Sequence, residues 1–533
     1  MHAGTVGLCR SRKVRLMDYL SGLNASFLHL ETAAVPMHAG SLILLDVPNE
    51  RSTAYLDELQ RHVAARMQTV ALFTRKLQTI PFSLSNPVWI TDENVDLDHH
   101  VRSHTLHGDG SMAELERLVA TLHAIPLDRG RPLWELHLVD GMSDGKLALF
   151  AKVHHAALDG IGATAILQAL ADPVPGEAHA PSEAKTPDGH PGAVSLLASS
   201  LSHALGQAFG MARQLPHGLR TLASMRGLPS AAPRTPFNVT ITAERSFTTL
   251  QLPLDELSLA ARAYAGTVND ALLAVVDGAL RRYLQASGPA PTGALVAAVP
   301  VNLRDRGDGH LSSQVSLWRA ELATSMADAG ARMRAIVHNT HAMRSGIATL
   351  RQLVPADFPG VGVPWMMGGA ALVAERTRLA EALPPAANVI VSHVSGPAEP
   401  PHIAGAKVLA TYPVSIVVHG LALNVTAQSC CDMLDIGIVA ATSAVPDLQR
   451  IVDNLRDAHA ELVAAARSIS PGKPASKHAT GEADIRPGGG GKAVSAAASG
   501  EASAPGAAGS AGAHRRNAGV APAAGRSARN KRG

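Results

Sequence analysis

Hydrophobic and polar positions follow two different periods along this chain. Short apolar runs rich in branched residues predict β-strands, and they cover residues 40–45, 133–139, 146–154, 294–299, 388–392 and 434–440. Longer runs with an apolar residue at every third or fourth position predict α-helices, and they cover residues 53–67, 111–124, 162–171, 268–284 and 445–465. No repeat occurs at the periods of solenoid proteins. The mixture of strands and helices predicts an α/β fold.

A break in composition divides the body of the chain into two halves. Residues 172–235 open with a stretch rich in Pro, Gly and charge, which reads as a linker. We therefore predict one subdomain over residues 17–171 and a second over residues 236–468. Apolar side chains at helical spacing inside the linker predict an amphipathic helix, which either packs on the body or lies on a lipid surface. These apolar positions are Leu197, Leu201, Leu205 and Phe209.

Both ends of the chain are basic, whereas the body is not. Residues 1–16 hold four basic residues and no acid, and residues 469–533 hold ten basic and three acidic residues. Residues 17–468 hold 33 basic and 41 acidic residues, which leaves a charge of −8. The acidic body and an aromatic content of only 3% predict that nucleic acid is not a partner. The Ala- and Gly-rich tail is predicted to be disordered, and so is the arm before residue 17, unless translation starts at Met17.

No segment is apolar enough to cross a membrane. The longest uncharged apolar run, residues 361–374, has 14 residues, whereas a spanning helix needs about 20. No hydrophobic stretch of the kind found in secretion signals precedes Met17. The three cysteines (Cys9, Cys430 and Cys431) are too few for a disulfide framework or a four-cysteine zinc site. We therefore expect a cytoplasmic protein.

The stretch AKVHHAALDGIGA, residues 151–163, is the best candidate for chemistry. An apolar strand delivers His154 and His155, and consecutive side chains of a strand point to opposite faces. A neutral imidazole is the usual general base near physiological pH. Asp159 can fix a tautomer or brace the turn, and Gly160 permits a backbone conformation or close approach that other residues resist. The pattern predicts a base that acts directly on a substrate hydroxyl.

Other chemistries fit this sequence less well. No third metal ligand is spaced near the two histidines, so we assign no metal. The stretch GIGATA, residues 160–165, lacks the acidic partner of a dinucleotide site, because the linker stands at that distance. The stretch GMSDG, residues 141–145, has the form of a serine nucleophile elbow but joins two strands, which favours a hairpin turn. A second histidine pair, His99 and His100, lacks the following Asp-Gly and indicates surface or packing residues.

HHAALDG, residues 154–160, resembles the HHxxxDG motif of the CoA-dependent acyltransferase superfamily, which includes chloramphenicol acetyltransferase. Further segments resemble one family within it, the bacterial wax ester synthases/diacylglycerol acyltransferases. They are LSGLNASFLHLETAAVPMHAGSL (20–42), WITDENVDLDHHVR (89–102), RPLWELHLVDG (131–141), PRTPFN (233–238), TVNDALLAVVDGALRRYL (267–284), VPVNLR (299–304), NVIVSHVSGP (388–397) and YPVSIVVHGLALNVT (412–426). The likeness runs in order over about residues 20–462 and excludes the tail.

The resemblance implies a chloramphenicol acetyltransferase-like fold of two subdomains, with mixed sheets covered by helices and a tunnel between the halves. It implies an O-acyltransferase that joins a long-chain acyl-CoA to diacylglycerol, which gives triacylglycerol, or to a fatty alcohol, which gives wax ester. Acyl-CoA is a substrate, so no cofactor is implied. The expected setting is the cytoplasmic face of the inner membrane or a lipid inclusion, with peripheral attachment. The resemblance assigns no oligomeric state.

Roles follow from the motif match, residue by residue. His155 corresponds to the catalytic base, and His154 is its supporting neighbour. Asp159 is expected to be architectural and to pair with Arg304 across the halves. The remaining positions are expected, with Arg304, to bind substrate, and the role of the ND element is structural or substrate-positioning. They are Pro132, Leu133 and Trp134 of the PLW element, Gly160 of the main motif, and Asn269 and Asp270 of the ND element.

The chain departs from the family pattern in its second half. Ser312 and Ser313 stand where a Gly-Asn pair is usual, and His393 and Ser395 stand where Asn and Pro are usual. These departures bear on substrate range more than on fold. Two other functions therefore stay open from the sequence. One is acylation of another amphipathic alcohol, and the other is a non-catalytic lipid-binding role.

Overall fold

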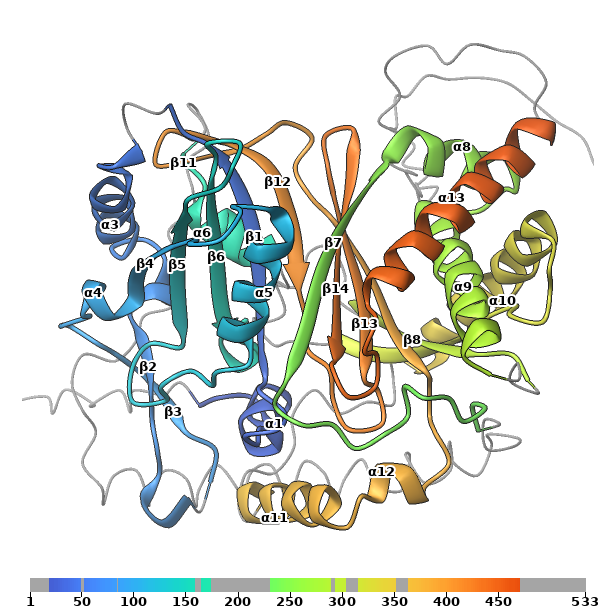
Figure 1. Ribbon diagram of the computed structural model, residues 1–533. Helices are drawn as coiled ribbons and strands as arrows, with labels where there is room; N and C mark the ends of the chain where they lie inside the picture. Colours follow the sequence, from blue (N-terminus) through green and yellow to red (C-terminus); the bar gives the residue numbers. More distant parts are fainter. Residues whose placement is uncertain are drawn as a thin grey trace, which may run out of the picture. The chain divides into compact units, whose positions relative to one another are not determined.

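The computed structural model describes residues 19–48, 52–83, 85–158, 164–173, 231–288, 293–302, 315–350 and 363–469 (Figure 1). All of them belong to one compact unit, residues 1–473. The predicted N-terminal arm, the linker helix over Leu197–Phe209 and nearly all of the predicted tail lie outside the described residues. No helix in the described ranges is long and apolar enough to cross a membrane.

Two six-stranded sheets form the centre of the unit, each with a mixture of strand directions. The first sheet has the order β11-β12-β1-β6-β5-β4 and the second has the order β7-β14-β13-β10-β8-β9. The strands of the first sheet are β1 (His38–Asp46), β4 (Val101–Thr105), β5 (Trp134–Asp140), β6 (Leu147–His154), β11 (His402–Ile403) and β12 (Ala406–Val414). Those of the second are β7 (Arg245–Pro253), β8 (Val296–Asn302), β9 (Val315–Glu321), β10 (Val389–Ser395), β13 (Leu423–Cys430) and β14 (Met433–Ala441).

Strand β12 joins the two halves. It comes from the second half of the chain but pairs antiparallel with β1 in the first sheet, and it also packs against β13 and β14 (Figure 1). The close approach of β14 needs a glycine, because a side chain at Gly437 would collide with the carbonyl of Pro413. The sheets therefore depart from the predicted subdomain boundary, since β11 and β12 complete the first sheet.

Most helices lie beside the sheet of their own half. In the first half the helices are α1 (Gly22–Leu30), α3 (Tyr55–Arg66), α4 (Leu97–His100), α5 (Met112–His123) and α6 (Thr164–Leu170). In the second they are α8 (Leu254–Ala263), α9 (Val268–Ser287), α10 (Ala329–Leu350), α11 (Val363–Arg376), α12 (Leu379–Ala382) and α13 (Gln449–Ile469). Helix α11, by contrast, packs on α1 of the first half. Figure 1 shows α8, α9, α10 and α13 together on one side of the second sheet, while α5 lies between the first sheet and β7. A short hairpin of β2 (Arg75–Gln78) and β3 (Val88–Thr91) completes the first half.

Each strand and helix that periodicity predicts within the described residues is present, with ends that differ by a few residues. The GMSDG stretch is a hairpin turn between the antiparallel strands β5 and β6, with Gly141 and Gly145 at φ 84° and 75°. It is therefore no nucleophile elbow. Elements that the pattern missed are mostly half-polar, such as β7, whose sequence RSFTTLQLP carries five polar side chains.

Candidate active site

The two histidines of the motif stand where a buried strand ends. All eight residues of β6 are buried, and His154 is the last of them. His155 opens a short 3-10 turn, η3 (His155–Ala157). The backbone N–H of His154 donates to the carbonyl of Leu133 at 3.0 Å, and that of His155 donates to the carbonyl of Met37 at 2.9 Å. Backbone contacts from two separate segments therefore fix the turn.

The ring of His155 is largely withdrawn from solvent. It stacks on Phe27 of α1, with ring centroids 4.9 Å apart and an interplanar angle of 20°. Its Nε2 atom is buried and has no hydrogen-bond partner among the described residues. Burial, with a smaller electrostatic contribution from His154, lowers the pKa of His155 to about 4. The ring is thus neutral near physiological pH and has a nitrogen free to accept a proton.

The ring of His154 points elsewhere and has a defined tautomer. The N–H of Ala156 donates to Nδ1 of His154 at 3.0 Å, so Nδ1 is an acceptor and carries no hydrogen. The hydrogen of the neutral ring must then be on Nε2. That atom lies 3.4 Å from the Oε1 atom of the Glu31 carboxylate, without the alignment of a hydrogen bond. His154 therefore braces the turn that carries His155.

Glu31 is a buried carboxylate that directly follows α1. Its Oε1 accepts the N–H of Met37 at 2.9 Å, and its Oε2 accepts two bonds from Arg129, at 2.6 and 3.1 Å. Burial raises the pKa of Glu31, but the contacts with His154, Met37 and Arg129 outweigh burial and lower it to about 2. The group is ionised at any physiological pH. Sequence spacing did not single it out, although it lies in the segment LETAAVPMHAGSL that carries the family resemblance.

The PLW element is buried beside this turn, and its members face different ways. Leu133 packs in a small apolar cluster with Ala156 and with Leu28 of α1, next to the histidines. Trp134 belongs to the core of the first half, where its indole N–H donates to the carbonyl of Phe73. Pro132 is also buried. Leu133 is thus the member that contacts the turn that begins with His155.

The second histidine pair has a packing role. His100 is buried, stacks on Trp134 at 4.3 Å and bonds the carbonyl of the same residue through Nδ1 at 2.7 Å. Across the described residues, no three His, Cys, Asp or Glu side chains come together as metal ligands would. Cys430 and Cys431 are neighbours at the end of β13, and burial raises the pKa of the Cys430 thiol to about 12.

The ND element lies apart from the histidines, at the start of α9. Asp270 is fully buried and closes a capping box with Thr267, and its other oxygen accepts bonds from Thr340 and Arg344 of α10. Figure 1 places α9 in the outer helix layer of the second half. The contacts of Asp270 are those of a helix cap, and Asn269 beside it is half-buried. Asp159, Gly160 and Arg304, with Ser312 and Ser313, lie outside the described residues.

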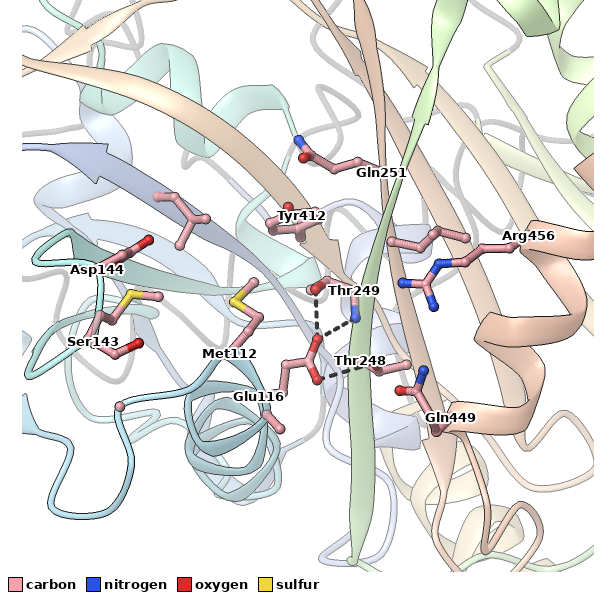
Figure 2. Close-up of a pocket in the computed structure, with 15 residues that line it drawn as sticks. Met112, Glu116, Ser143, Asp144, Thr248, Thr249, Gln251, Tyr412, Gln449 and Arg456 are labelled. Carbon is pink, nitrogen blue, oxygen red and sulfur yellow. Dashed lines mark hydrogen bonds between the residues drawn. The ribbon is translucent and has the colours of Figure 1, made fainter.

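A cavity of about 610 Å³ opens between the two halves (Figure 2). Its walls come from α5, the β5–β6 turn, β7, β12 and α13. Glu116 of α5 crosses it and accepts hydrogen bonds from Thr248 and Thr249 of β7. His155 is not among the described residues that line it, so the predicted tunnel between the halves stays a prediction.

Comparison with protein families gives two matches that together span most of the described chain. A model of the wax ester synthase/diacylglycerol acyltransferase catalytic domain matches residues 20–272, and one of the WS/DGAT C-terminal domain matches residues 312–463. A protein of Mycobacterium tuberculosis (strain CDC 1551 / Oshkosh) named diacylglycerol O-acyltransferase is 34% identical over 451 residues, 83% of this chain and 99% of that protein. One of the same name from Mycobacterium bovis is 32% identical over 456 residues, 84% of this chain and 99% of that protein.

Solved structures agree with these matches. The wax ester synthase/diacylglycerol acyltransferase from Marinobacter aquaeolei VT8 is similar, with a TM-score of 0.61 and 29% identity over 84% of this chain and 99% of that one. The first condensation domain of the CDA synthetase has a TM-score of 0.50 and 13% identity over 86% of this chain and 98% of that one, which shows the fold alone. The two-subdomain fold expected from the HHAALDG stretch is confirmed.

Proposed function

Because the chain belongs to the wax ester synthase/diacylglycerol acyltransferase family, we propose that it transfers a long-chain acyl group from acyl-CoA to the hydroxyl of diacylglycerol, of a fatty alcohol, or of both. His155 is the general base of this proposal. The observation that carries it is the buried Nε2 atom of His155, which has no hydrogen-bond partner among the described residues. Such a nitrogen is suited to accept a proton from a bound hydroxyl.

In the proposed reaction, Nε2 of His155 takes the alcohol proton as the alcohol oxygen attacks the thioester carbonyl. The new C–O bond gives a tetrahedral oxyanion. Collapse of the oxyanion breaks the C–S bond, and the CoA thiolate leaves with the proton that the imidazolium returns. The products are an ester and CoA, and His155 is neutral again. The thioester is already activated, so the scheme needs neither an acyl-enzyme nor a cofactor.

The low pKa of His155 fits this cycle in two ways. At about pH 7 the ring is unprotonated before each turnover, so no enzyme is held in the wrong state. Once the proton moves, the imidazolium lies next to an oxyanion in a site of low dielectric, where opposite charges attract strongly. The charge pair offsets the weak proton affinity of the resting ring. General-base catalysis of this kind contributes about 10²–10⁴-fold in rate.

We place the enzyme at a lipid surface, to which its substrates partition. Helix α11 packs on α1, and α1 packs on the η3 turn that begins with His155. The outward positions of α11 include Met366, Leu372 and Val373, which are exposed apolar side chains. Apolar side chains along an exposed helix are typical of surfaces that rest in a lipid interface. This surface supports peripheral attachment close to the catalytic turn.

The test is an acceptor panel with purified protein. Palmitoyl-CoA is supplied with diacylglycerol, with hexadecanol, or with a short amphipathic alcohol, and released CoA thiol is measured while mass spectrometry identifies the ester. We expect ester only with the first two acceptors. His155→Ala should lower the rate at least about 10²-fold with an unchanged unfolding curve, and His99→Ala is the matched histidine control. Normal turnover by a folded His155→Ala variant refutes the mechanism, and lipid binding without CoA release points to a non-catalytic protein.

A further inference from the structure

We propose that Glu31, held by Arg129, is a positioning residue for His155, an inference that rests on the proposed role of that histidine. Glu31 does not touch the His155 ring. It acts through three neighbours of His155, which are the side chain of His154, the backbone of Met37 and the Phe27 ring of α1. The Glu31–Arg129 pair thereby holds the turn that carries His155 in its position.

The first contact runs through the side chain of His154. Nδ1 of His154 can receive the N–H of Ala156 only if its own hydrogen is on Nε2. The Glu31 carboxylate, 3.4 Å from Nε2, favours that tautomer electrostatically. With a neutral residue at position 31, the alternative tautomer costs less. Its Nδ1–H would then face the N–H of Ala156, and the η3 turn would lose a bond.

The second contact runs through the backbone of Met37. Oε1 of Glu31 accepts the Met37 N–H at 2.9 Å, while the Met37 carbonyl receives the N–H of His155 at 2.9 Å. The Glu31 carboxylate therefore contacts both the side chain of His154, which precedes the base, and Met37, which accepts the backbone N–H of the base. A shift of Met37 moves the His155 backbone directly.

The third contact runs along α1. Glu31 directly follows the last residue of this helix, and Phe27, which stacks on His155, lies one turn earlier. Arg129 binds Glu31 through two nitrogens and also donates to the carbonyl of Leu28 at 2.8 Å. The same arginine thus fixes the carboxylate and the end of the helix that supplies the stacking ring.

The Glu31–Arg129 pair differs from an ordinary surface ion pair, because its carboxylate is buried. The Glu31 side chain is 5% exposed, whereas that of Arg129 is 45% exposed. The neighbouring Arg131 offers a contrast, because its partner Asp96 is itself 49% exposed. Exposed pairs contribute little to stability or geometry, whereas a buried carboxylate that accepts three hydrogen bonds holds its surroundings firmly. Arg131→Ala is therefore a matched control for Arg129→Ala.

The test compares kcat and KM for palmitoyl-CoA in Glu31→Gln, Glu31→Asp, Arg129→Ala, Arg129→Lys and Arg131→Ala, each checked for folding by thermal unfolding. We expect kcat to fall about 10–100-fold in Glu31→Gln with KM nearly unchanged, because a misplacement of about 1 Å costs on that order. The loss of kcat should be smaller in Arg129→Ala than in Glu31→Gln and smaller again in Arg129→Lys. The kcat of Arg131→Ala should match that of the wild type. If Glu31→Gln does not fold, the kcat of Arg129→Ala tests the proposal, because the half-exposed Arg129 side chain can be replaced without unfolding the protein.

A double-mutant cycle shows whether Glu31 acts through His154. In a His154→Asn background, the asparagine oxygen can still accept the Ala156 N–H, but no imidazole tautomer remains to be fixed. Glu31→Gln should then cost several-fold less in kcat than it does in the wild type. Full additivity shows that Glu31 does not act through His154, and a wild-type kcat in folded Glu31→Gln overturns the whole proposal. His155→Ala is measured in parallel. If this variant keeps its activity, His155 is not the base. If it loses activity while Glu31→Gln keeps the wild-type kcat, only the positioning role of Glu31 is refuted.

Discussion

Glu116 of α5 accepts both the N–H and the hydroxyl of Thr249 on β7, each at 2.7 Å from Oε1. Its other oxygen accepts the hydroxyl of Thr248 (Figure 2). Strand β7 is at the edge of the second sheet, so the Thr249 N–H points away from its only strand neighbour. A side chain from the first half thus completes the hydrogen bonding of an edge strand in the second half. This contact ties the two halves together where the cavity between them opens.

We predict that Glu116→Ala destabilises the protein by about 1–3 kcal/mol, because the Thr249 N–H loses its acceptor. Glu116→Gln keeps one carbonyl oxygen and should cost less. Urea unfolding followed by circular dichroism gives both values. Arg117→Ala, one position along the same helix and exposed, should stay within about 0.5 kcal/mol of the wild type. Equal stability of Glu116→Ala and Arg117→Ala contradicts the prediction.

A second prediction concerns pH and the buried Asp277 of α9. Burial raises its pKa to about 6, although the N–H of Ala323 and the hydroxyl of Thr324 both bond the carboxyl group. The folded pKa is above the reference value of 3.8, so folding favours the protonated form. The resulting stabilisation is complete below that reference value and is lost as the pH rises through about 6.

Asp277→Asn cannot titrate, so it isolates this contribution from that of the other buried groups. The free energy of unfolding of the wild type minus that of the variant should fall by roughly 1–3 kcal/mol between about pH 4 and pH 7. The measurement is a series of urea unfolding curves for both proteins across that range. A difference that does not change with pH shows that Asp277 is ionised in the fold at low pH too.

Local pattern sufficed to predict the elements that hold the turn at His155, and the reason is physical. Strand β6 is buried on both faces, so its sequence is a nearly continuous apolar run, and the run ends at the His154–His155 pair. Helix α5 is amphipathic, and its N-cap Ser111 accepts from the Glu114 N–H. Such elements carry their own boundaries in the sequence.

Contacts between distant segments could not be predicted in this way. Glu31 and Arg129 look like ordinary polar residues at the ends of two different segments, and only the folded chain brings them to His154. The same is true of β12, whose pairing with β1 depends on how the second half crosses to the first sheet. Sequence spacing records the period of one element, whereas these contacts depend on the packing of several.

The rate of the reaction should show the lowered pKa of His155. The base works only when unprotonated, so activity is present above its pKa and is lost as the pH falls through it. With a pKa of about 4, kcat/KM should be nearly flat between about pH 5.5 and pH 8 and should fall only below that range. Release of CoA from palmitoyl-CoA at saturating hexadecanol measures the profile. An inflection near the ordinary histidine value of 6.5 shows that solvent reaches the ring freely.

Phe27→Ala tests which side chain keeps that solvent away. Removal of the stacked phenyl ring exposes one face of the His155 imidazole, so the pKa of His155 should rise towards 6.5 and the acid limb of the pH–rate profile should move up with it. At about pH 5 the variant should therefore lose more activity, relative to its own plateau, than the wild type does. Phe27→Leu keeps an apolar cover without the ring and should shift the limb less. Phe82→Ala is the control, because the Phe82 ring is 79% exposed. If the acid limb of Phe27→Ala coincides with that of the wild type, the protection of His155 comes from other groups, and the stacking contact has no part in its low pKa.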